Sequence, residues 1–173
     1  KNQGKNDGLA YGKTFSSIEA FSGTSEDDAF YGSDGRDILS GRDGADILQG
    51  RGGSDLLTGG DGSDVLTGGS GRDVFDFTGY EEDWRVDTVT DFTSGQDKLR
   101  FDLADLGFAS KASVNLVNAK APVAADGGPS LLFDTDDHLL WIDTDGRGET
   151  DGPALLLVLD GVSKLAVSDF DFV

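Results

Sequence analysis

Large apolar side chains recur every nine residues between Gly23 and Asp76. They occupy the eighth position of six consecutive nonapeptides: Phe30, Leu39, Leu48, Leu57, Leu66 and Phe75. The last three residues of each nonapeptide are mostly β-branched or bulky and apolar, which favours a very short strand. One nonapeptide cannot bury its own apolar side chain, so the copies must stack on one another. The pattern therefore predicts a solenoid of short strands.

Glycine and aspartate follow the same nine-residue period. Position one of every copy is Gly, position four is Gly except in the first copy, which has Glu26, and position six is always Asp. The sixth positions are Asp28, Asp37, Asp46, Asp55, Asp64 and Asp73. Gly at positions one and four, and at position two of the last two copies, gives access to positive φ values. We therefore expect the first six residues of each copy to form a tight turn.

Stacked turns would place one aspartate above another. Carboxylates held close together repel, so a proton or a cation must relieve the repulsion. Residues 23–76 contain twelve Asp or Glu and four Arg, a balance of −8. The turns offer carboxylates and carbonyls but no thiol or imidazole, and such a ligand set suits Ca²⁺ better than Mg²⁺, which needs a stricter octahedron. The pattern therefore predicts several calcium ions, about four or more, since about four divalent ions would cancel this charge.

The repeat resembles the RTX (repeat-in-toxin) nonapeptide G-G-x-G-x-D-x-U-x, in which U is a large apolar residue. The resemblance implies an all-β fold: a right-handed parallel β-roll, or β-helix solenoid, in which two nonapeptides form one turn. It also implies that each calcium ion lies between one loop and the second loop after it. The first loop gives the carbonyls of positions two and four and its Asp. The later loop gives the carbonyls of positions one and three and its Asp.

Carried over to this chain, the resemblance implies four calcium sites. Their ligands would come from Thr24, Glu26, Asp28, Gly41, Asp43 and Asp46; from Ser33, Gly35, Asp37, Gly50, Gly52 and Asp55; from Arg42, Gly44, Asp46, Gly59, Asp61 and Asp64; and from Arg51, Gly53, Asp55, Gly68, Ser70 and Asp73. The first copy is degenerate, so its site departs most from the family pattern. The alternative is a disordered linker rich in Gly and Asp, which the regular apolar eighth position disfavours.

The residues before the repeats, 1–22, are expected to form a linker and an N-terminal cap. Lys1–Lys13 is polar and Gly-rich, as expected of a linker. Thr14–Ser22 has apolar residues at intervals of three, which fits either a short helical turn or a degenerate first rung of the roll. Because an uncovered solenoid end would expose an unpaired edge, we interpret this segment as a cap.

The segment after the repeats, residues 77–101, predicts two strands separated by a turn at Thr93–Gly95. It resembles the D-x-I-x-D-F-x-x-G-x-D-x-I/L element that follows the repeats in secreted serralysin-type metalloproteases. In that family aspartates of the element complete the last calcium sites, which makes candidates of Asp87, Asp91 and Asp97. Their partners would be Gly60, Gly62 and Asp64 in one loop and Gly69, Gly71 and Asp73 in the next. The alternative is that the three acids are ordinary solvated residues.

The rest of the chain predicts a β-rich capping region, so that residues 77–173 form one C-terminal unit. Asp102–Phe108 has a capping Asp, two Leu on one side and a stop at Gly107, which predicts one or two helical turns. A further strand is expected within Ser113–Val117. Three apolar runs predict antiparallel strands at Ser130–Phe133, Leu139–Ile142 and Ala154–Leu159.

The loop Asp143–Asp151 carries part of an EF-hand pattern. Arg147 and Ala154 occupy two positions of that pattern that need oxygen ligands, so we favour a plain hairpin loop over a weak calcium site.

The C-terminus, Val167–Val173, ends in an acid followed by apolar residues. It resembles the uncleaved export signal at the extreme C-terminus of type I secretion substrates, particularly serralysins. This resemblance implies the type I secretion apparatus as a partner. The alternative is a final edge strand that packs on the roll, and the two interpretations are compatible.

Charge and composition narrow the functions. The formal net charge of the 173 residues is −19, which argues against nucleic acid, anionic lipid and acidic polysaccharide as partners across the general surface. So much negative charge also opposes compaction, so a bound ligand should support the fold. The chain has no Cys and no run of eighteen apolar residues, so we expect neither thiol chemistry nor a membrane span.

The sequence shows no catalytic motif. It lacks the H-E-x-x-H motif of zinc metallopeptidases and the G-x-S-x-G elbow, and His138 is the only histidine. The nine-residue period of the carboxylates favours metal binding over acid–base chemistry. We therefore expect no enzyme activity in this chain, which begins at Lys1 and is interpreted as the C-terminal piece of a larger protein that could itself be an enzyme.

Together these patterns predict a secreted, monomeric calcium-binding module. It would stay unfolded where calcium is scarce, pass through a type I channel and fold when calcium binds outside the cell. The alternative is a polysaccharide-binding or adhesion accessory module. The R-modules of epimerases, which it resembles, have a similar size and also join a roll to a C-terminal tail.

Overall fold

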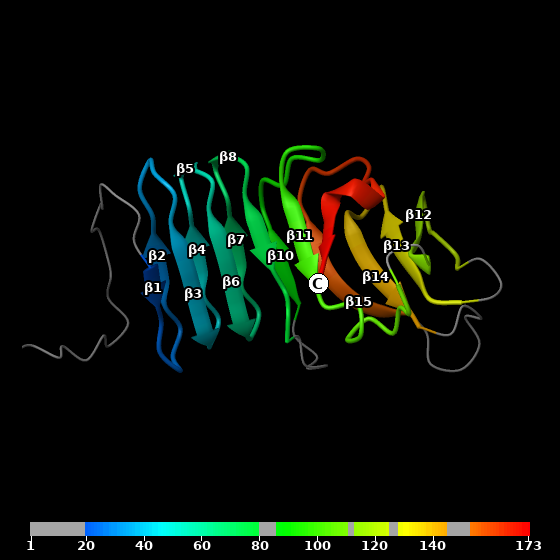
Figure 1. Ribbon diagram of the computed structural model, residues 1–173, viewed down its shortest axis with the longest axis horizontal. Helices are drawn as coiled ribbons and strands as arrows, with labels where there is room; N and C mark the ends of the chain where they lie inside the picture. Colours follow the sequence, from blue (N-terminus) through cyan, green and yellow to red (C-terminus); the bar gives the residue numbers. More distant parts are fainter. Residues whose placement is uncertain (1–19, 80–85, 111–112, 125–127, 145–152) are drawn as a thin grey trace, which may run out of the picture.

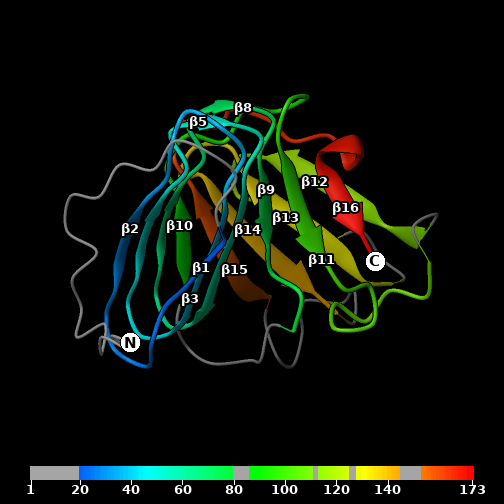
Figure 2. The same ribbon diagram turned by 60° about the vertical axis from the view of Figure 1, so that its left-hand side comes forward.

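A computed structural model describes residues 20–79, 86–110, 113–124, 128–144 and 153–173. Nearly all regular structure in these ranges is β-strand, and η2 (Val167–Asp169) is a single 3₁₀ turn. The strands form two long sheets that face each other along the roll (Figures 1 and 2). None of the helical structure in the described ranges is long and apolar enough to cross a membrane.

Successive nonapeptides contribute strands to the two sheets in turn. Copies one, three and five form β2 (Ala29–Tyr31), β4 (Ile47–Gln49) and β7 (Val65–Thr67) in an eight-stranded sheet. Copies two, four and six form β3 (Ile38–Asp43), β6 (Leu56–Asp61) and β9 (Val74–Asp76) in a six-stranded sheet. Neighbouring strands are parallel and their register advances by two copies, so two nonapeptides form one turn of a parallel β-roll.

The core of the roll is the row of eighth-position side chains between the two sheets. Phe30 is 4% exposed and the other five are fully buried, as the sequence pattern predicts. Burying a side chain of this size contributes about 1.5–3 kcal/mol. The seventh-position side chains point outwards instead, and Ile47 is 46% exposed. Because side chains alternate along a strand, each three-residue strand turns only its central side chain towards the core. Neighbouring copies must cover that side chain, so no copy is stable alone.

The first rung of the roll precedes the repeats. β1 (Ala20–Ser22) pairs with β3 in parallel and is the edge strand of the six-stranded sheet. Phe21 stacks on Phe30 with their ring centroids 6.1 Å apart. Of the two interpretations of this segment, the structure therefore supports a strand over a helical turn for residues 20–22. The remainder of the expected cap and the linker, residues 1–19, lies outside the described residues.

The roll continues beyond the repeats. The two strands predicted after the repeats are present as β10 (Asp87–Val89) and β11 (Lys98–Phe101). β10 extends the eight-stranded sheet and β11 extends the six-stranded one. β15 (Ala154–Leu159) and β16 (Phe170–Phe172) then add one more parallel strand to each sheet. The C-terminus is therefore a strand of the roll, and Phe170 and Phe172 are buried in its core.

A small antiparallel unit widens the eight-stranded sheet at its far end. The three predicted strands are present as β13 (Ser130–Asp134), β14 (Leu139–Asp143) and β15, and they pair in antiparallel fashion. The fourth, β12 (Asn115–Ala119), pairs with β13 in parallel. Most of the loop with the partial EF-hand pattern, residues 145–152, lies outside the described part of the chain.

The helical turns predicted at Asp102–Phe108 are present as a short run of hydrogen-bonded turns and not as a regular helix. The amide of Leu106 donates to the carbonyl of Asp102 (3.4 Å) and that of Gly107 to the carbonyl of Ala104 (3.1 Å), and Leu106 and Phe108 are buried in the core. The Asp102 carboxylate accepts a hydrogen bond from the amide of Ala104 (2.7 Å), and Gly107 has a left-handed conformation (φ 71°). A segment this short gains more from packing its apolar side chains than from one turn of helix.

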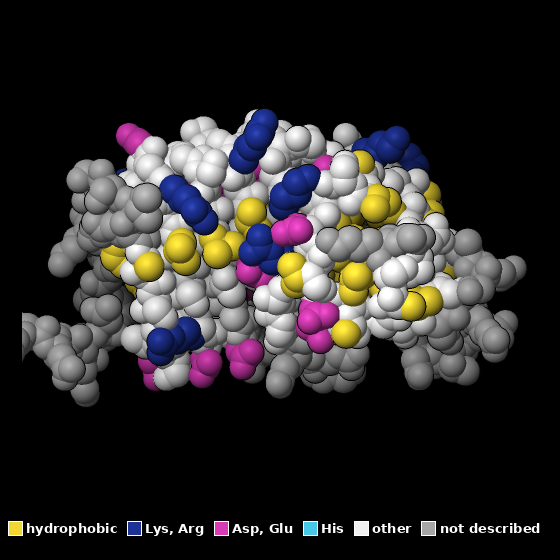
Figure 3. All heavy atoms as spheres, in the orientation of Figure 1, with side chains coloured by type: hydrophobic (Ala, Val, Ile, Leu, Met, Phe, Trp, Pro, Cys, Tyr) yellow, Lys and Arg dark blue, Asp and Glu magenta, His cyan; other side chains and the backbone are white. Residues whose placement is uncertain are grey.

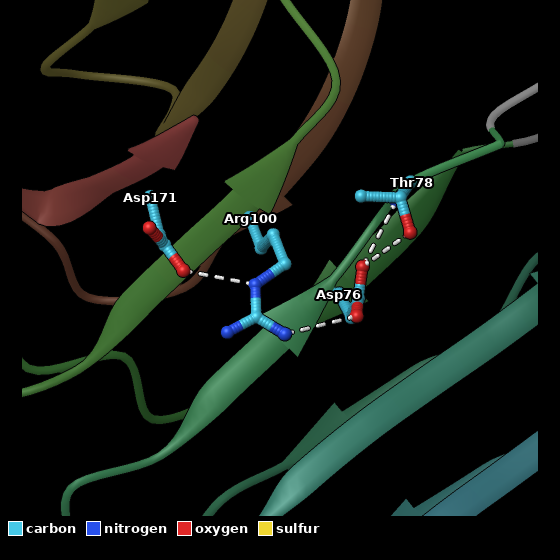
Figure 4. Close-up of polar contacts among 4 residues, drawn as sticks. All are labelled: Asp76, Thr78, Arg100 and Asp171. Atoms are coloured by element: carbon cyan, nitrogen blue, oxygen red, sulfur yellow. Dashed lines mark hydrogen bonds and ion pairs between the residues drawn. The ribbon is translucent and has the colours of Figure 1, made fainter. Parts of the chain in front are cut away.

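One ion-pair network joins the repeats to the C-terminal strand. Arg100 on β11 lies in register with Asp76 on β9 and Asp171 on β16. Its guanidinium is 3.3 Å from the Asp76 carboxylate and 2.9 Å from that of Asp171 (Figure 4). Asp76 also accepts hydrogen bonds from the amide and hydroxyl of Thr78. The network fixes the register of the last three parallel strands.

Replacing Arg100 with Ala is expected to lower the free energy of unfolding by about 1 kcal/mol, because its two ion pairs are partly shielded from water. Urea unfolding at saturating calcium measures this change. The matched control is Lys120→Ala, which removes the exposed Lys120–Asp136 pair (side chains 78% and 53% exposed) and should change stability little. Equal losses for the two variants would contradict the role given to Arg100.

Candidate metal centre

The sixth-position aspartates lie inside the roll, although aspartate is normally a surface residue. All six are at most 5% exposed: Asp28, Asp37, Asp46, Asp55, Asp64 and Asp73. Each immediately precedes a strand whose side chains alternate between core and surface. The turn must therefore carry the carboxylate back towards the axis of the roll. The two kinds of turn lie along opposite edges, so the acids form two columns, one from the odd copies and one from the even copies.

Backbone amides link the acids within each column. The amide of Asp28 donates to Oδ1 of Asp46 (2.7 Å), and that of Asp46 donates to Oδ1 of Asp64 (2.8 Å), each eighteen residues further on. The even column repeats this contact from Asp37 to Asp55 (2.8 Å) and from Asp55 to Asp73 (2.9 Å). One oxygen of each acceptor carboxylate is therefore occupied by the preceding turn of the roll.

The second oxygen of several of these carboxylates has no protein donor. Oδ2 of Asp46, Asp55 and Asp73 is buried and accepts no hydrogen bond. A buried polar atom in this state costs about 1–3 kcal/mol, and more when the group is charged. A cation at this oxygen would remove the penalty, so these aspartates fit a bound metal ion.

Carbonyl oxygens share the space in front of these carboxylates. A Cβ built on Gly32 would lie 2.6 Å from Asp37 Oδ2 and 2.6 Å from the carbonyl oxygen of Gly50, the first residue of the loop two copies later. Gly41 has the same relation to Asp46 and Gly59. The carboxylate of one loop and the position-one carbonyl of the second loop after it therefore border one small space.

This geometry corrects the expected role of the position-one glycines. None of them has a positive φ. They are glycines because a side chain would collide with the carboxylate and the carbonyl in front of it. Positive φ values occur at position four, as at Gly44 (118°), and at position two, including the non-glycine residues Arg42 (85°) and Arg51 (76°), where such a conformation is uncommon.

All the predicted ligand residues lie in the described part of the chain. Position-four carbonyls also face the loop two copies later: a Cβ on Gly53 would be 2.5 Å from the carbonyl oxygen of Gly35. Some predicted carbonyls accept an inter-loop hydrogen bond, for example Arg51 from the amide of Ser70 (2.7 Å). A carbonyl has two lone pairs, so the second is available for a metal. Within the described ranges no three acidic or histidine side chains converge, so an ion here needs these carbonyls.

The three candidate acids after the repeats have different positions. Asp87 and Asp97 are buried and continue the two columns, because they accept the amides of Asp64 (2.9 Å) and Asp73 (3.0 Å). Asp91 lies outside the columns, half-buried, and accepts the amides of Gly68 (2.9 Å) and Gly69 (2.7 Å). Asp87 and Asp97 are therefore buried, unlike the solvated residues of the alternative interpretation. Asp91 stabilises the loop of copy six through its hydrogen bonds.

Asp169 is a buried acid that the sequence reasoning assigned only to the terminal motif. It is fully buried, and its carboxylate accepts hydrogen bonds from the Ser94 hydroxyl (2.6 Å) and the amides of Gly95 (2.8 Å) and Ala166 (2.8 Å). It thereby covers the last turn of the even column. The sequence signal that could have indicated its burial is its position directly before a strand of alternating apolar residues, as for the aspartates of the repeats.

Burial and mutual repulsion make these carboxylates hard to ionise. Burial, the largest cause, raises the pKa of Asp46, Asp55 and Asp73, to about 6 for Asp55, although hydrogen bonds from the preceding turn act in the opposite direction. Neighbouring acids of the same column raise each pKa further; for Asp55 these are Asp73 and Asp37. Without a cation, the folded columns therefore hold protons more tightly than the unfolded chain does.

The sign of the pH effect follows. A carboxyl whose pKa is higher in the folded than in the unfolded state stabilises the fold at low pH and loses this contribution as pH rises through the folded value. In EDTA we therefore expect more β-structure near pH 5 than near pH 7.5, with a difference of about 1–3 kcal/mol in the free energy of unfolding, since one pKa unit corresponds to about 1.4 kcal/mol. Far-UV circular dichroism measures the change.

A control in about 0.5 M NaCl screens the general surface charge, because the Debye length falls to a few ångströms. The difference should persist there. A β-signal that grows with pH in EDTA would contradict the assignment.

Comparison with known proteins gives two findings. Residues 22–57 and 40–75 match the family described as RTX calcium-binding nonapeptide repeat (4 copies). The chain is similar over 86% of its length to the solution structure of the AlgE6R3 subunit of the Azotobacter vinelandii mannuronan C5-epimerase. The sequence identity is 27%, the TM-score is 0.53, and 80% of that chain is covered. No curated protein sequence matches the chain significantly. The narrower resemblance to serralysins stays a prediction.

Proposed function

We propose that the chain, whose residues 22–75 match RTX calcium-binding nonapeptide repeats, folds by binding calcium outside the cell and carries the export signal of a larger secreted protein. The observation that carries the proposal is the set of buried Oδ2 atoms without a donor, at Asp46, Asp55 and Asp73. A calcium ion would supply the positive charge that these oxygens lack. Its binding free energy would then become folding free energy.

Each ion would lie between two loops, one loop and the second loop after it. The column aspartates provide the charged ligands, and carbonyls at positions one to four provide the neutral ones. The glycines at position one keep the space open, and the amide ladder holds Oδ1 of Asp46, Asp55 and Asp73 so that Oδ2 faces the ion. Extracellular modules of low affinity respond to about 10⁻⁴–10⁻³ M calcium, which would keep the chain unfolded inside the cell.

Calcium titration of paired variants tests this proposal. Asp55→Asn combined with Asp73→Asn removes two column charges and should lower the number of bound ions by at least one and raise the calcium concentration needed for folding. Asp34→Asn is the matched control, because Asp34 is an exposed acid in the loop of copy two, along the same edge of the roll. Isothermal titration calorimetry counts the ions. Identical stoichiometries for the double variant, the control and the parent chain would reject the proposed sites.

The export part of the proposal rests on the C-terminal motif. In the folded chain Phe170 is 7% exposed and Phe172 is 3% exposed, so a receptor could read these side chains only before folding. This order agrees with export of an unfolded chain that folds afterwards. Fusion of residues 77–173 to a reporter in a strain with a type I exporter tests it. Export that is unaffected by deletion of residues 168–173 would reject this signal.

A second candidate function is binding of an anionic polysaccharide along one edge of the roll. The loops of copies two, four and six contain Arg36, Arg51 and Arg72 but, apart from the column aspartates, only one acid, Asp34. The loops of the odd copies contain four such acids and one Arg. Figure 3 shows basic side chains towards the edge with the loops of β5 (Gly52–Gly53) and β8 (Ser70–Gly71), and acidic ones at the opposite edge.

The net charge of −19 opposes such a ligand over the general surface but not along this edge. The similarity to a subunit of an epimerase that acts on mannuronan supports the candidate. Titration of acidic glycans at saturating calcium tests it, with Arg36→Glu plus Arg72→Glu as the disrupting variant and Arg42→Glu, on the opposite edge, as the control. Absence of binding by the parent chain would reject this function.

A further inference from the structure

The loops of the roll differ in how they satisfy the second oxygen of their aspartate. In the first copy Asp28 Oδ2 accepts the amide (2.7 Å) and the hydroxyl (3.0 Å) of Thr24, four residues earlier. In the second copy Asp37 Oδ2 accepts the amide (2.6 Å) and hydroxyl (3.0 Å) of Ser33. In both loops the donor is the residue at position two, so the protein itself saturates this oxygen.

The turn after the repeats uses the same contact. Thr93 precedes Asp97 by four residues, and its amide donates to Asp97 Oδ2 (2.8 Å). Neither Thr93 nor the two earlier donors has a positive φ. A Ser or Thr in this backbone conformation directs its N–H back at the carboxylate, as in a local side-chain-to-backbone cap.

The loops of Asp46, Asp55 and Asp73 lack this contact. Their position-two residues are left-handed: Arg42 (φ 85°), Arg51 (φ 76°) and Gly69 (φ 97°). Their Oδ2 atoms are the buried acceptors without a donor. The amide of Gly69 donates to the carboxylate of Asp91 (2.7 Å) and not to that of Asp73.

We infer that the residue at position two decides whether a loop needs a cation. A Ser or Thr without a positive φ completes the carboxylate with protein donors. A left-handed Arg or Gly leaves one carboxylate oxygen for a metal ion. This inference rests on the proposed calcium binding and assigns it to particular loops.

The consequence is a roll with a cation-dependent centre and cation-independent ends. Copies three to six have a left-handed residue at position two, including Gly60 (φ 109°) in copy five. In the loops at either end, of copies one and two and of residues 93–97, Oδ2 of the aspartate accepts a hydrogen bond from the amide four residues earlier. In Asp37 the oxygen without a donor is Oδ1. In later loops this oxygen accepts a hydrogen bond from the amide eighteen residues earlier. For Asp37 the corresponding residue is 19, which lies outside the described part of the chain.

Two substitutions at one position separate the two states of a loop. Arg51→Ser allows a negative φ and supplies both donors to Asp55, so the chain should bind one calcium ion fewer than the parent. Arg51→Gly keeps the left-handed conformation and should bind the same number as the parent. Both variants lose the contact of the Arg51 guanidinium with the Tyr31 ring (5.8 Å), so the loss of this contact cannot account for a difference between them.

Native mass spectrometry at saturating calcium counts the ions. The reverse change, Ser33→Gly, removes the hydroxyl and admits the left-handed conformation, so it should add one ion. Ser33→Ala also removes the hydroxyl but disfavours a positive φ, so its amide should still donate to Asp37 and no ion should be added. If Arg51→Ser does not fold, as judged by circular dichroism, Arg42→Ser and Arg42→Gly repeat the comparison in the other column. Equal counts for the Ser and Gly variants would overturn the inference while leaving calcium binding intact. A parent chain without bound calcium would instead overturn the proposed function.

Discussion

Replacing Leu57 with Ala is expected to lower the free energy of unfolding of the calcium-loaded protein by about 2–5 kcal/mol. Leu57 is fully buried in the centre of the six-stranded sheet, in register with Leu39 on one side and Phe75 on the other. The rungs are fixed by parallel pairing on both sides, so the cavity cannot close by local movement. A loss of this size is a large part of the 5–15 kcal/mol that stabilises a typical domain.

The control for this variant is its neighbour. Leu56 has the same side chain on the same strand but points outwards and is only half-buried. Leu56→Ala should therefore cost less than about 1.5 kcal/mol, because the Leu56 side chain buries less apolar surface than that of Leu57. Urea unfolding at saturating calcium gives both values. Equal losses at the two positions would mean that the eighth-position row is not the core of the roll.

Deleting Ser168–Val173 is expected to have an effect as large, about 3–6 kcal/mol from the burial of Phe170 and Phe172 alone. The deletion also removes the Asp169 carboxylate that covers the turn at Ser94 and Gly95. The last strand of the six-stranded sheet would be missing, so its neighbour would become an open edge. The refolded chain should need more calcium to reach half its β-signal, as measured by circular dichroism.

Two variants make this deletion interpretable. Phe172→Ala keeps the strand and removes one buried ring, so it should reproduce about half of the loss. Val173→Ala changes a side chain that is 60% exposed and should have little effect. Unchanged calcium dependence after the deletion would show that the C-terminal strand is not part of the cooperative unit.

The repeat made most of the roll predictable. A period of nine with one apolar position fixes where each strand lies and which side chain it buries, because a strand of three residues can turn only its central side chain inwards. The parallel roll with two copies per turn came from the RTX resemblance. The two strands after the repeats were predictable for a similar reason, since Val89 and Leu99 alternate with polar neighbours. Those features are local, and local sequence is sufficient for them.

Features that depend on contacts between distant segments were not predictable. The position-one glycines were expected to adopt positive φ, but they are needed because another loop approaches them, which no single copy reveals. The turns at Asp102–Phe108 were predicted, but packing in the core decided that they form no regular helix. Asp169 was assigned only to the terminal motif because its partners, Ser94 and Gly95, are more than seventy residues away in the chain.

The same limit applies to the candidate site. The RTX resemblance implied which loops would pair, and the structure places each loop beside the second one after it. The sequence could not show that Oδ1 of Asp46, Asp55 and Asp73 accepts an amide while Oδ2 depends on the residue at position two. Thr24 and Ser33 look like neutral departures from a glycine pattern, but their hydroxyl and amide groups take the place that a cation would have in the later loops.

The central claim is that the folded roll requires cations to neutralise its two columns of buried aspartates. Far-UV circular dichroism of the whole chain near pH 7.5, first in EDTA and then with calcium added to about 10 mM, which exceeds the range in which extracellular modules respond, tests it most directly. We predict a largely unfolded spectrum in EDTA and a cooperative change to a β-spectrum as calcium is added, with magnesium at the same concentration ineffective. A complete β-spectrum in EDTA, unchanged by calcium, would contradict the claim.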